Sequence, residues 1–253
     1  MVHGLASDFQ GVIETGAVLT KLAKTGAGQV LMYFNGSSVP EVADAAVVTL
    51  PFSVLRTITL DLSLGLSSDK RRAIDELGYG TNSKTMIGFN GALWLSAYGS
   101  NGAAYSDMPN MQTCWETNPT RRSATSVLTD YSAGPRGASL TSANLQSQVG
   151  AFLSGLEPIW PGIGAAATRN GANYVARLAN WTTYPWSRGS YTCYRPGQFT
   201  SIAGLEGQRA GHLHFAGEHT DSFYSWQGYM EGACLSGIAA ANEILNDIKK
   251  KRL

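Results

Sequence analysis

Residues 212–245, HLHFAGEHTDSFYSWQGYMEGACLSGIAAANEIL, are the stretch that decides the fold of this chain. The apolar run at 213–216 predicts a buried strand, which Gly217 ends. A polar and aromatic loop follows at 218–227, and a helix is predicted to begin near Gly228. A strand, a glycine turn and a helix start together place unpaired backbone N–H groups and a positive dipole end beside an electron-rich ligand. An ordinary closing strand and helix without a ligand is the alternative that the pattern leaves open.

The predicted closing helix has a face of mostly small side chains. These residues recur at helical spacing and are Tyr229, Ala233, Ser236, Gly237, Ala240, Ala241, Ile244 and Ile248. Because small side chains leave room, another backbone is expected to lie close against this face.

Two patterns near the start of the chain predict strands. Residues 11–34 predict a hairpin, with KTGAGQ as the turn between GAVLTKLA and VLMYF. The apolar run at 45–50 is typical of a strand buried on both faces, and Pro51 ends it.

Helical patterns occur in two further segments. Residues 67–77 predict a short helix that Ser67 or Ser68 caps and Gly78 stops. The segment LQSQVGAFLSGLEPIWPG at 145–162 has helical spacing that ends before its first proline.

Composition and charge argue against several classes of protein. The chain has 253 residues and a net charge of +1, so no broad basic face for nucleic acid is expected. No apolar run approaches membrane-spanning length, and the first residues do not resemble a signal peptide. We therefore expect a soluble protein, with the cytoplasm favoured. The three cysteines, Cys114, Cys193 and Cys234, match no metal-binding pattern.

Two motifs in the closing stretch carry a family resemblance. FAGEHT at 215–220 and SWQGYMEGA at 225–233 closely resemble the C-terminal flavin-binding segment of the flavin-containing amine oxidases, which include monoamine, polyamine and L-amino-acid oxidases. The resemblance covers only the C-terminal part of the family's length. It implies an α/β (α+β) fold, with part of an FAD-binding Rossmann-like domain and a mixed-sheet substrate domain. The implied division is FAD-domain strands at 1–56, a substrate-binding domain at 57–195, and a return to the FAD domain at 196–253.

The resemblance implies that FAD is the cofactor. In the family, the pair matched by Gly217 and Glu218 lies at the FAD pyrophosphate and ribityl chain. The helix start, matched by Gly228, Tyr229 and Met230, meets the pyrimidine edge of the isoalloxazine ring. Negative charge develops there when flavin is reduced, and a helix N-terminus stabilises such charge.

Further cofactor positions follow from the same resemblance. Leu19 and Leu22 match two apolar positions of the strand whose backbone pairs with the FAD adenine, and Val18 is the alternative register. Trp181 matches a tryptophan beside the flavin. Ser190 stands where monoamine oxidases carry the flavin-linking cysteine, so FAD is expected to be held non-covalently.

Three residues are the candidate catalytic set. By its pattern alone, Lys84 at a strand start would be a solvated surface charge. The resemblance implies instead that Lys84, in the G-x-x-x-K pattern from Gly80, holds a water against flavin N5 and stabilises negative charge on oxygen. Tyr191 and Tyr229 match two tyrosines whose facing rings flank the substrate amine. Such apolar walls keep the amine neutral and aligned.

The dinucleotide-binding motif G-x-G-x-x-G does not occur in this sequence. GAGQ, GYGTN and GPRGA each lack the third glycine, a preceding buried strand or a following helix. We therefore expect a partner chain, or a further N-terminal segment, that carries the motif and covers an exposed sheet surface. A second chain of a two-chain or processed enzyme, a truncated product and an independently folded remnant are the three interpretations.

The leading hypothesis is FAD-dependent oxidation of a small-molecule amine by hydride transfer to flavin N5, with oxygen as the second substrate and imine and hydrogen peroxide as products. One alternative is a non-catalytic subunit or remnant that binds a partner chain and no FAD. Another is an L-amino-acid oxidase, which needs an arginine for the substrate carboxylate; Arg188 and Arg195 are the nearest candidates.

Overall fold

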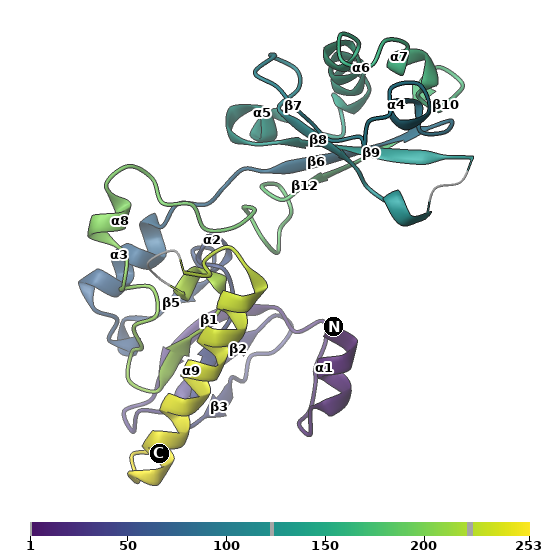
Figure 1. Ribbon diagram of the computed structural model, residues 1–253. Helices are drawn as coiled ribbons and strands as arrows, with labels where there is room; N and C mark the ends of the chain where they lie inside the picture. Colours follow the sequence, from purple (N-terminus) through teal and green to yellow (C-terminus); the bar gives the residue numbers. More distant parts are fainter. Residues whose placement is uncertain (1, 122–123, 222–224) are drawn as a thin grey trace.

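The structure, a computed structural model, describes residues 2–121, 124–221 and 225–253. It has two lobes joined by two crossing stretches of chain (Figure 1). The lower lobe contains both termini and the sheets β3-β2-β1-β5 and β13-β4, and the upper lobe contains the five-stranded sheet β12-β6-β9-β8-β7. This mixed α/β architecture agrees with the predicted fold class.

The predicted hairpin is present in the lower lobe. Strand β1 (Leu19–Lys24) pairs antiparallel with β2 (Val30–Phe34), and β2 pairs with β3 (Glu41–Ala43). On its other side β1 runs parallel to β5 (Thr59–Leu60). The turn closes where Gly28 N–H donates to the Thr25 carbonyl, and Gly28 takes a φ of 96° that glycine adopts without strain. Helix α1 (Val2–Asp8) precedes the hairpin.

The parallel pair β4 (Ala46–Val48) and β13 (Leu213–Phe215) corrects one prediction. Strand β4 is not buried on both faces, because the side chain of Val47 is 40% exposed. Its outer face borders an apolar groove of about 710 Å³ instead of a covering layer. The strand nevertheless ends at the expected place, since α2 (Phe52–Leu55) starts directly after Pro51.

The capped helix prediction is confirmed by α3 (Ser68–Glu76). Ser67 Oγ accepts the Lys70 backbone N–H at 3.1 Å, and Ile74 and Leu77 are fully buried. Between α2 and α3 lies the short helix η1 (Leu62–Leu64). These elements share one core with β1 and β13, so the predicted start of the substrate domain at residue 57 falls inside the packing of the lower lobe.

Lys70 is an unusual member of that lower core, because only 1% of it is exposed. Its Nζ donates to the Glu206 carbonyl and lies 3.5 Å from the centroid of the Phe215 ring. The rings of Phe52 and Phe215 lie against the charge, which is a cation–π arrangement. Burial lowers the pKa of Lys70 to about 7.

The upper lobe has one covered and one open sheet face. Its antiparallel strands are β6 (Ser83–Phe89), β7 (Ala104–Tyr105), β8 (Thr113–Glu116), β9 (Ser126–Ser132) and β12 (Ala176–Asn180). Helices α4 (Leu93–Ser96), α5 (Gly134–Ser139), α6 (Leu145–Leu156) and α7 (Ile163–Ala166) lie along one side of this sheet (Figure 1). Alternate residues of β6, from Ser83 to Phe89, are buried on that side, which leaves Lys84 and Met86 on the open face. The helix predicted from residue 145 to before Pro158 is confirmed by α6. The small elements η2 (Pro119–Arg121), β10 (Arg169–Asn170) and β11 (Asn173–Tyr174) complete the lobe.

The chain then returns to the lower lobe through α8 (Gln198–Ser201), β13, η3 (Glu218–Thr220) and the closing helix α9 (Met230–Lys249). The strand, glycine turn and helix of the closing stretch are confirmed, although residues 222–224 of the intervening loop lie outside the described residues. The small face of α9 is partly as predicted: Ser236 Oγ accepts the Gly217 N–H at 2.9 Å, and Ala240 is buried.

Other members of that predicted face are exposed. Tyr229 and Ile248 are 66% and 52% exposed, and Ala241 is also on the solvent side. At 3.6 residues per turn, the row that contains Ser236 and Ala240 continues to Asp247, whose carboxylate is buried against Arg209. None of the helices in the described part of the chain is long and apolar enough to cross a membrane.

Candidate active site

The two stretches that cross between the lobes are bonded to each other. Gly80 N–H donates to the Tyr191 carbonyl at 2.8 Å, and Ser190 N–H donates to the Gly80 carbonyl at 2.9 Å. A Cβ at Gly80 would lie 2.6 Å from Ser190 Oγ, so a larger residue at this position would force the Ser190 side chain to move. The crossing therefore fixes the start of β6, which carries Lys84, beside Tyr191.

Lys84 lies on the open face of the upper sheet, directly opposite Tyr131 of β9. Its Nζ is 5.7 Å from the centroid of the Tyr131 ring and 5.8 Å from that of Trp115. The two rings are 5.5 Å apart, so they form an aromatic surface beneath the ammonium group. A cation is thereby held at the sheet face by side chains that do not neutralise it.

Tyr191 connects Lys84 with the start of the closing helix. Its hydroxyl oxygen is 3.3 Å from that of Tyr131. A Cβ built on Gly228 would lie 3.6 Å from the Tyr191 ring, so this ring packs beside the residue that precedes Tyr229. The structure thus connects three predicted positions, Lys84, Tyr191 and Gly228, through successive contacts that pass by way of Tyr131.

Sequence reasoning missed Tyr131 and Trp115. The sequence does not indicate which strands lie beside residues 83–89. Only the pairing of β6 with β9 and of β9 with β8 places Tyr131 beside Lys84 and Trp115 close to both.

Tyr229 and Trp181 lie less closely against this group. Tyr229 contacts Trp226 edge-on at 6.3 Å, and Trp181 contacts Tyr184 edge-on at 6.2 Å. Among the described residues, no ring contact joins Tyr229 to Tyr191, so the facing pair of tyrosines stays a prediction. Trp181 lines a cavity of about 510 Å³ at the end of β12.

Glu218 lies on the lower-lobe side of the site. One carboxylate oxygen accepts the N–H and O–H of Thr192 at 3.0 and 3.1 Å, and the other accepts the Gly228 N–H at 2.7 Å. Burial raises the pKa of Glu218. Both oxygens are therefore engaged by the protein, and this side chain fixes the loop around Gly228 to the crossing stretch. Gly217 precedes it with a φ of 130°, a conformation suited to glycine.

The amino end of α9 is electrostatically open. Tyr229 is its N-cap residue and makes no side-chain capping bond, and Met230 is exposed. The first N–H groups of this 20-residue helix make no bond within the helix and carry partial positive charge, which Glu231 in the first turn partly offsets. Leu19 lies at the apolar groove in the same lobe. An apolar groove and an open helix end fit the two kinds of group, flat aromatic and electron-rich, that FAD contains.

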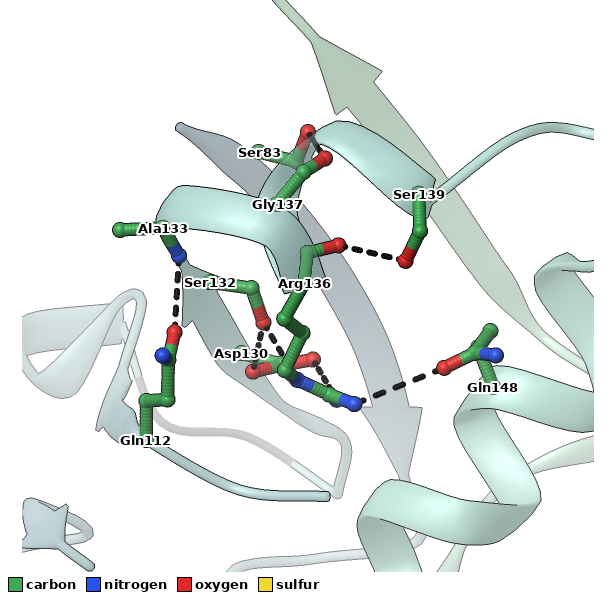
Figure 2. Close-up of polar contacts among 9 residues, drawn as sticks. All are labelled: Ser83, Gln112, Asp130, Ser132, Ala133, Arg136, Gly137, Ser139 and Gln148. Atoms are coloured by element: carbon green, nitrogen blue, oxygen red, sulfur yellow. Dashed lines mark hydrogen bonds and ion pairs between the residues drawn. The ribbon is translucent and has the colours of Figure 1, made fainter. Parts of the chain in front are cut away.

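A network of polar contacts lies behind the open sheet face and holds its strands in place (Figure 2). Arg136 on α5 donates from Nη2 to Asp130 Oδ2 at 3.1 Å and from Nε to Ser132 Oγ at 2.9 Å. Ser83 Oγ donates to the Gly137 carbonyl at 2.8 Å, which ties α5 to the start of β6. The residues next to Lys84 and Tyr131, namely Ser83 and Asp130, are therefore anchored on the covered side.

The open face of the upper sheet carries a lysine that lies over two aromatic rings. The Gly-Glu turn and the start of α9 lie in the lower lobe. Together these features define an α/β oxidoreductase with a site suited to a flavin. The chain belongs to the flavin containing amine oxidoreductases, whose family model matches residues 1–245. FAD is the cofactor of this family.

Known relatives agree with this assignment. The chain is 30% identical over 203 residues to the putative L-amino-acid oxidase YobN of Bacillus subtilis (strain 168), a match that covers 80% of this chain and 41% of that protein. It is 28% identical over 228 residues to polyamine oxidase 4 of Oryza sativa subsp. japonica, with 89% and 43% covered. Among solved structures, cyclohexylamine oxidase from Brevibacterium oxydans IH-35A superposes with a TM-score of 0.74 at 19% identity, over 91% of this chain and 48% of that one. The chain thus spans a little under half the length of the proteins it matches.

Proposed function

We propose that this chain supplies the substrate-facing half of an FAD-dependent amine oxidase. The observation that supports this most strongly is the chain of contacts that connects Lys84, through Tyr131 and Tyr191, with the Gly228 turn. The chemistry supplied by bound FAD is acceptance of a hydride at N5 from the carbon bearing the amine and delivery of the electrons to oxygen, which yields an imine and hydrogen peroxide.

Lys84 and the tyrosines supply charge and orientation in this proposal. Lys84 positions a water near N5 and stabilises negative charge as oxygen is reduced. Tyr191 and Tyr229 flank the amine with their rings, and Trp181 lies beside the edge of the flavin ring. An apolar cage of this kind disfavours the ammonium form and holds the reacting carbon in line.

The lower lobe holds the cofactor in the same proposal. The start of α9 at Tyr229 and Met230 would present its partial positive charge to the electron-rich edge of the flavin, beside the Gly228 turn, and Gly217 would leave room for the backbone to approach the phosphates. Glu218 fixes these two segments and lies near the ribityl chain. Leu19 contacts the adenine through its strand. Ser190 donates its hydroxyl to Asn82 Oδ1 at 2.8 Å, which supports a FAD that is held without a covalent link at this position.

A further segment or partner chain with the dinucleotide-binding motif completes the cofactor domain. Two exposed apolar surfaces in the lower lobe support this part of the proposal. One is the groove beside Leu19 and Val47. The other is a stripe along α9, on which Ile238 and Ile248 are 59% and 52% exposed. Surfaces of this kind are typical of unfilled protein contacts.

Flavin uptake tests the proposal. The chain is purified alone and after co-expression with a polypeptide that carries the motif, and flavin absorbance is recorded before and after anaerobic addition of benzylamine. Bleaching of bound flavin, followed by hydrogen peroxide when air is admitted, is the expected result. A complex that binds the partner polypeptide but no flavin would favour a non-catalytic subunit.

Replacing Lys84 by methionine is expected to slow reoxidation of reduced flavin by about tenfold, equivalent to ~1.4 kcal/mol of lost charge stabilisation. The rate is followed by stopped flow after anaerobic reduction. Lys249→Met, at the exposed end of α9, is the control and should leave the rate unchanged. An unchanged rate in the Lys84 variant would remove this residue from the oxygen reaction.

An L-amino-acid substrate is the second candidate, favoured by the similarity to YobN. Arg188 and Arg195 are both exposed, whereas Arg177 lies on the open sheet face, two residues from the partner of Lys84 in β12. We expect Arg177→Met to raise the KM for an amino acid by about tenfold or more, with little change for the corresponding amine, because the guanidinium pairs with a carboxylate. Arg188→Met is the matched control, and steady-state kinetics with both substrates is the measurement.

A further inference from the structure

Asn82 is bonded to three hydroxyl side chains, which the proposed function does not use as a group. It is 5% exposed and immediately precedes β6. Its Nδ2 donates to Tyr131 Oη and, at 3.3 Å, to Tyr191 Oη. Its Oδ1 accepts the Ser190 hydroxyl at 2.8 Å, which fixes the orientation of the amide. Both N–H groups of the amide therefore point to tyrosine oxygens.

The two tyrosine hydroxyl groups have more protons than the nearby side chains have acceptors. The two tyrosine oxygens are 3.3 Å apart, so only one of their two protons can lie between them. Both oxygens already accept from Asn82, so the amide offers neither hydroxyl an acceptor. Within residues 2–121, 124–221 and 225–253, one tyrosine O–H thus has no acceptor. It belongs to the pair that lies between Lys84 and the Gly228 turn.

We propose that Asn82 is a positioning residue that holds a free tyrosine O–H in the site, and that this O–H recognises the substrate amine in its neutral form. A neutral amine has a lone pair that accepts a hydrogen bond, whereas an ammonium group has only donors. The Lys84 ammonium, over the same Tyr131 ring, repels a second cation. The inference rests on the proposed function, to which it adds the hydrogen-bond donor that recognises the amine and the residue that positions this donor.

The groups around the tyrosine pair permit a clean pH experiment. The titratable side chains are Lys84 on β6, Tyr131 on β9, Tyr191 on the crossing stretch, and Glu218, which reaches Thr192 next to Tyr191. Burial raises the pKa of Tyr131 to about 12, so its hydroxyl keeps its proton near neutral pH. A permanently charged amine does not titrate, so its binding across pH 6.5 to 8.5 reports any change in the protein, and the difference from a titrating amine reports the protonation of the ligand.

The test is calorimetric binding to the full chain, with FAD and the motif-bearing polypeptide present, under anaerobic conditions and across that pH range. The probes are benzylamine and benzyltrimethylammonium, a permanent cation. For the unaltered protein, benzylamine affinity should rise about tenfold per pH unit, in step with the neutral fraction of the amine. The permanent cation should bind at least about tenfold more weakly than benzylamine at pH 8.5.

Asn82→Asp replaces both N–H donors by acceptors, so both tyrosine protons turn to the new carboxylate. The pH trend should then flatten or reverse, and the permanent cation should bind more tightly. Tyr131→Phe is the matched control, because it removes one hydroxyl yet leaves the Tyr191 O–H free; it should keep the rising trend. Ser190→Ala, a smaller change, removes the donor that orients the amide and should weaken the trend even if Asn82→Asp does not fold.

The results separate this inference from the proposed function. An unchanged pH trend in Asn82→Asp, or in Ser190→Ala if the former does not fold, would overturn the role of Asn82. Equal affinity of the unaltered protein for both probes at pH 8.5 would overturn selection of the neutral amine. Neutral-amine selection without reduction of flavin would instead refute the oxidase function and leave the recognition element standing.

Discussion

Replacing Arg136 by methionine is expected to lower the free energy of unfolding by about 3–5 kcal/mol, because it leaves a buried carboxylate without its cation. The Asp130 side chain is 3% exposed and that of Arg136 is 12% exposed, so water replaces little of the lost interaction. Burial raises the pKa of Asp130 even with Arg136 in place, and the guanidinium opposes that rise. Urea denaturation measures the difference.

The loss should depend on pH in a definite direction. Without Arg136, the folded-state pKa of Asp130 rises further above its unfolded value, so the folded protein binds more protons. Its stability is then retained at low pH and lost as pH rises through the folded-state pKa. The Arg136→Met variant should accordingly be less impaired at pH 5 than at pH 8.

A second substitution distinguishes a buried charge from a simple packing loss. Adding Asp130→Asn to Arg136→Met removes the unpaired carboxylate and should recover part of the stability. Equal stability of the single and double variants would show that the charge at Asp130 contributes little. The network in Figure 2 anchors Ser83 and Asp130, which are the neighbours in sequence of Lys84 and Tyr131.

Lys70 is expected to make the unaltered protein more stable by about 1–2 kcal/mol at pH 8.5 than at pH 7. Its folded-state pKa of about 7 lies below the unfolded value of 10.5. The unfolded state therefore binds more protons in this range, and the free energy of unfolding rises with pH. Lys70→Met should abolish this rise, whatever its effect on stability at a single pH.

Urea denaturation at the two pH values provides the measurement. Arg71→Met, on the same helix but partly exposed beside Asp75, is the control and should keep the pH dependence. A pH dependence that persists unchanged in Lys70→Met would show that the buried ammonium is not its source.

Local signals made much of the lower lobe predictable. Ser67 caps α3 through its own hydroxyl, Gly28 closes the first hairpin, and Gly217 ends β13, each within a few residues of the element concerned. The position of Lys84 at the start of a strand was also predictable from the sequence. Its environment was not, because it depends on β9 and β8, which are distant in sequence and lie in a stretch without strong periodicity.

The predictions that the structure corrects, and the residue that the sequence did not indicate, depend in the same way on neighbours that are distant in the sequence. Continuous apolar character at 45–50 predicts burial on both faces only if covering layers exist, and Val47 borders a groove instead. The exposed side of α9 looked like part of a packing face because Ala241 and Ile248 are apolar. Asn82 gave no signal, since an asparagine before a strand is ordinary until its three hydroxyl neighbours, Tyr131, Tyr191 and Ser190, are located.

The crossing stretches also bear on how such chains diversify. The upper lobe leaves and re-enters the lower one at adjacent points, since Ser83 and Asn180 are partners in neighbouring strands. A continuous piece of chain whose two ends meet resembles a cassette inserted into a host domain. Exchange of the upper lobe between relatives would change the residues that face the substrate. The turn at Gly217 and Glu218, in the lower lobe, would remain unchanged.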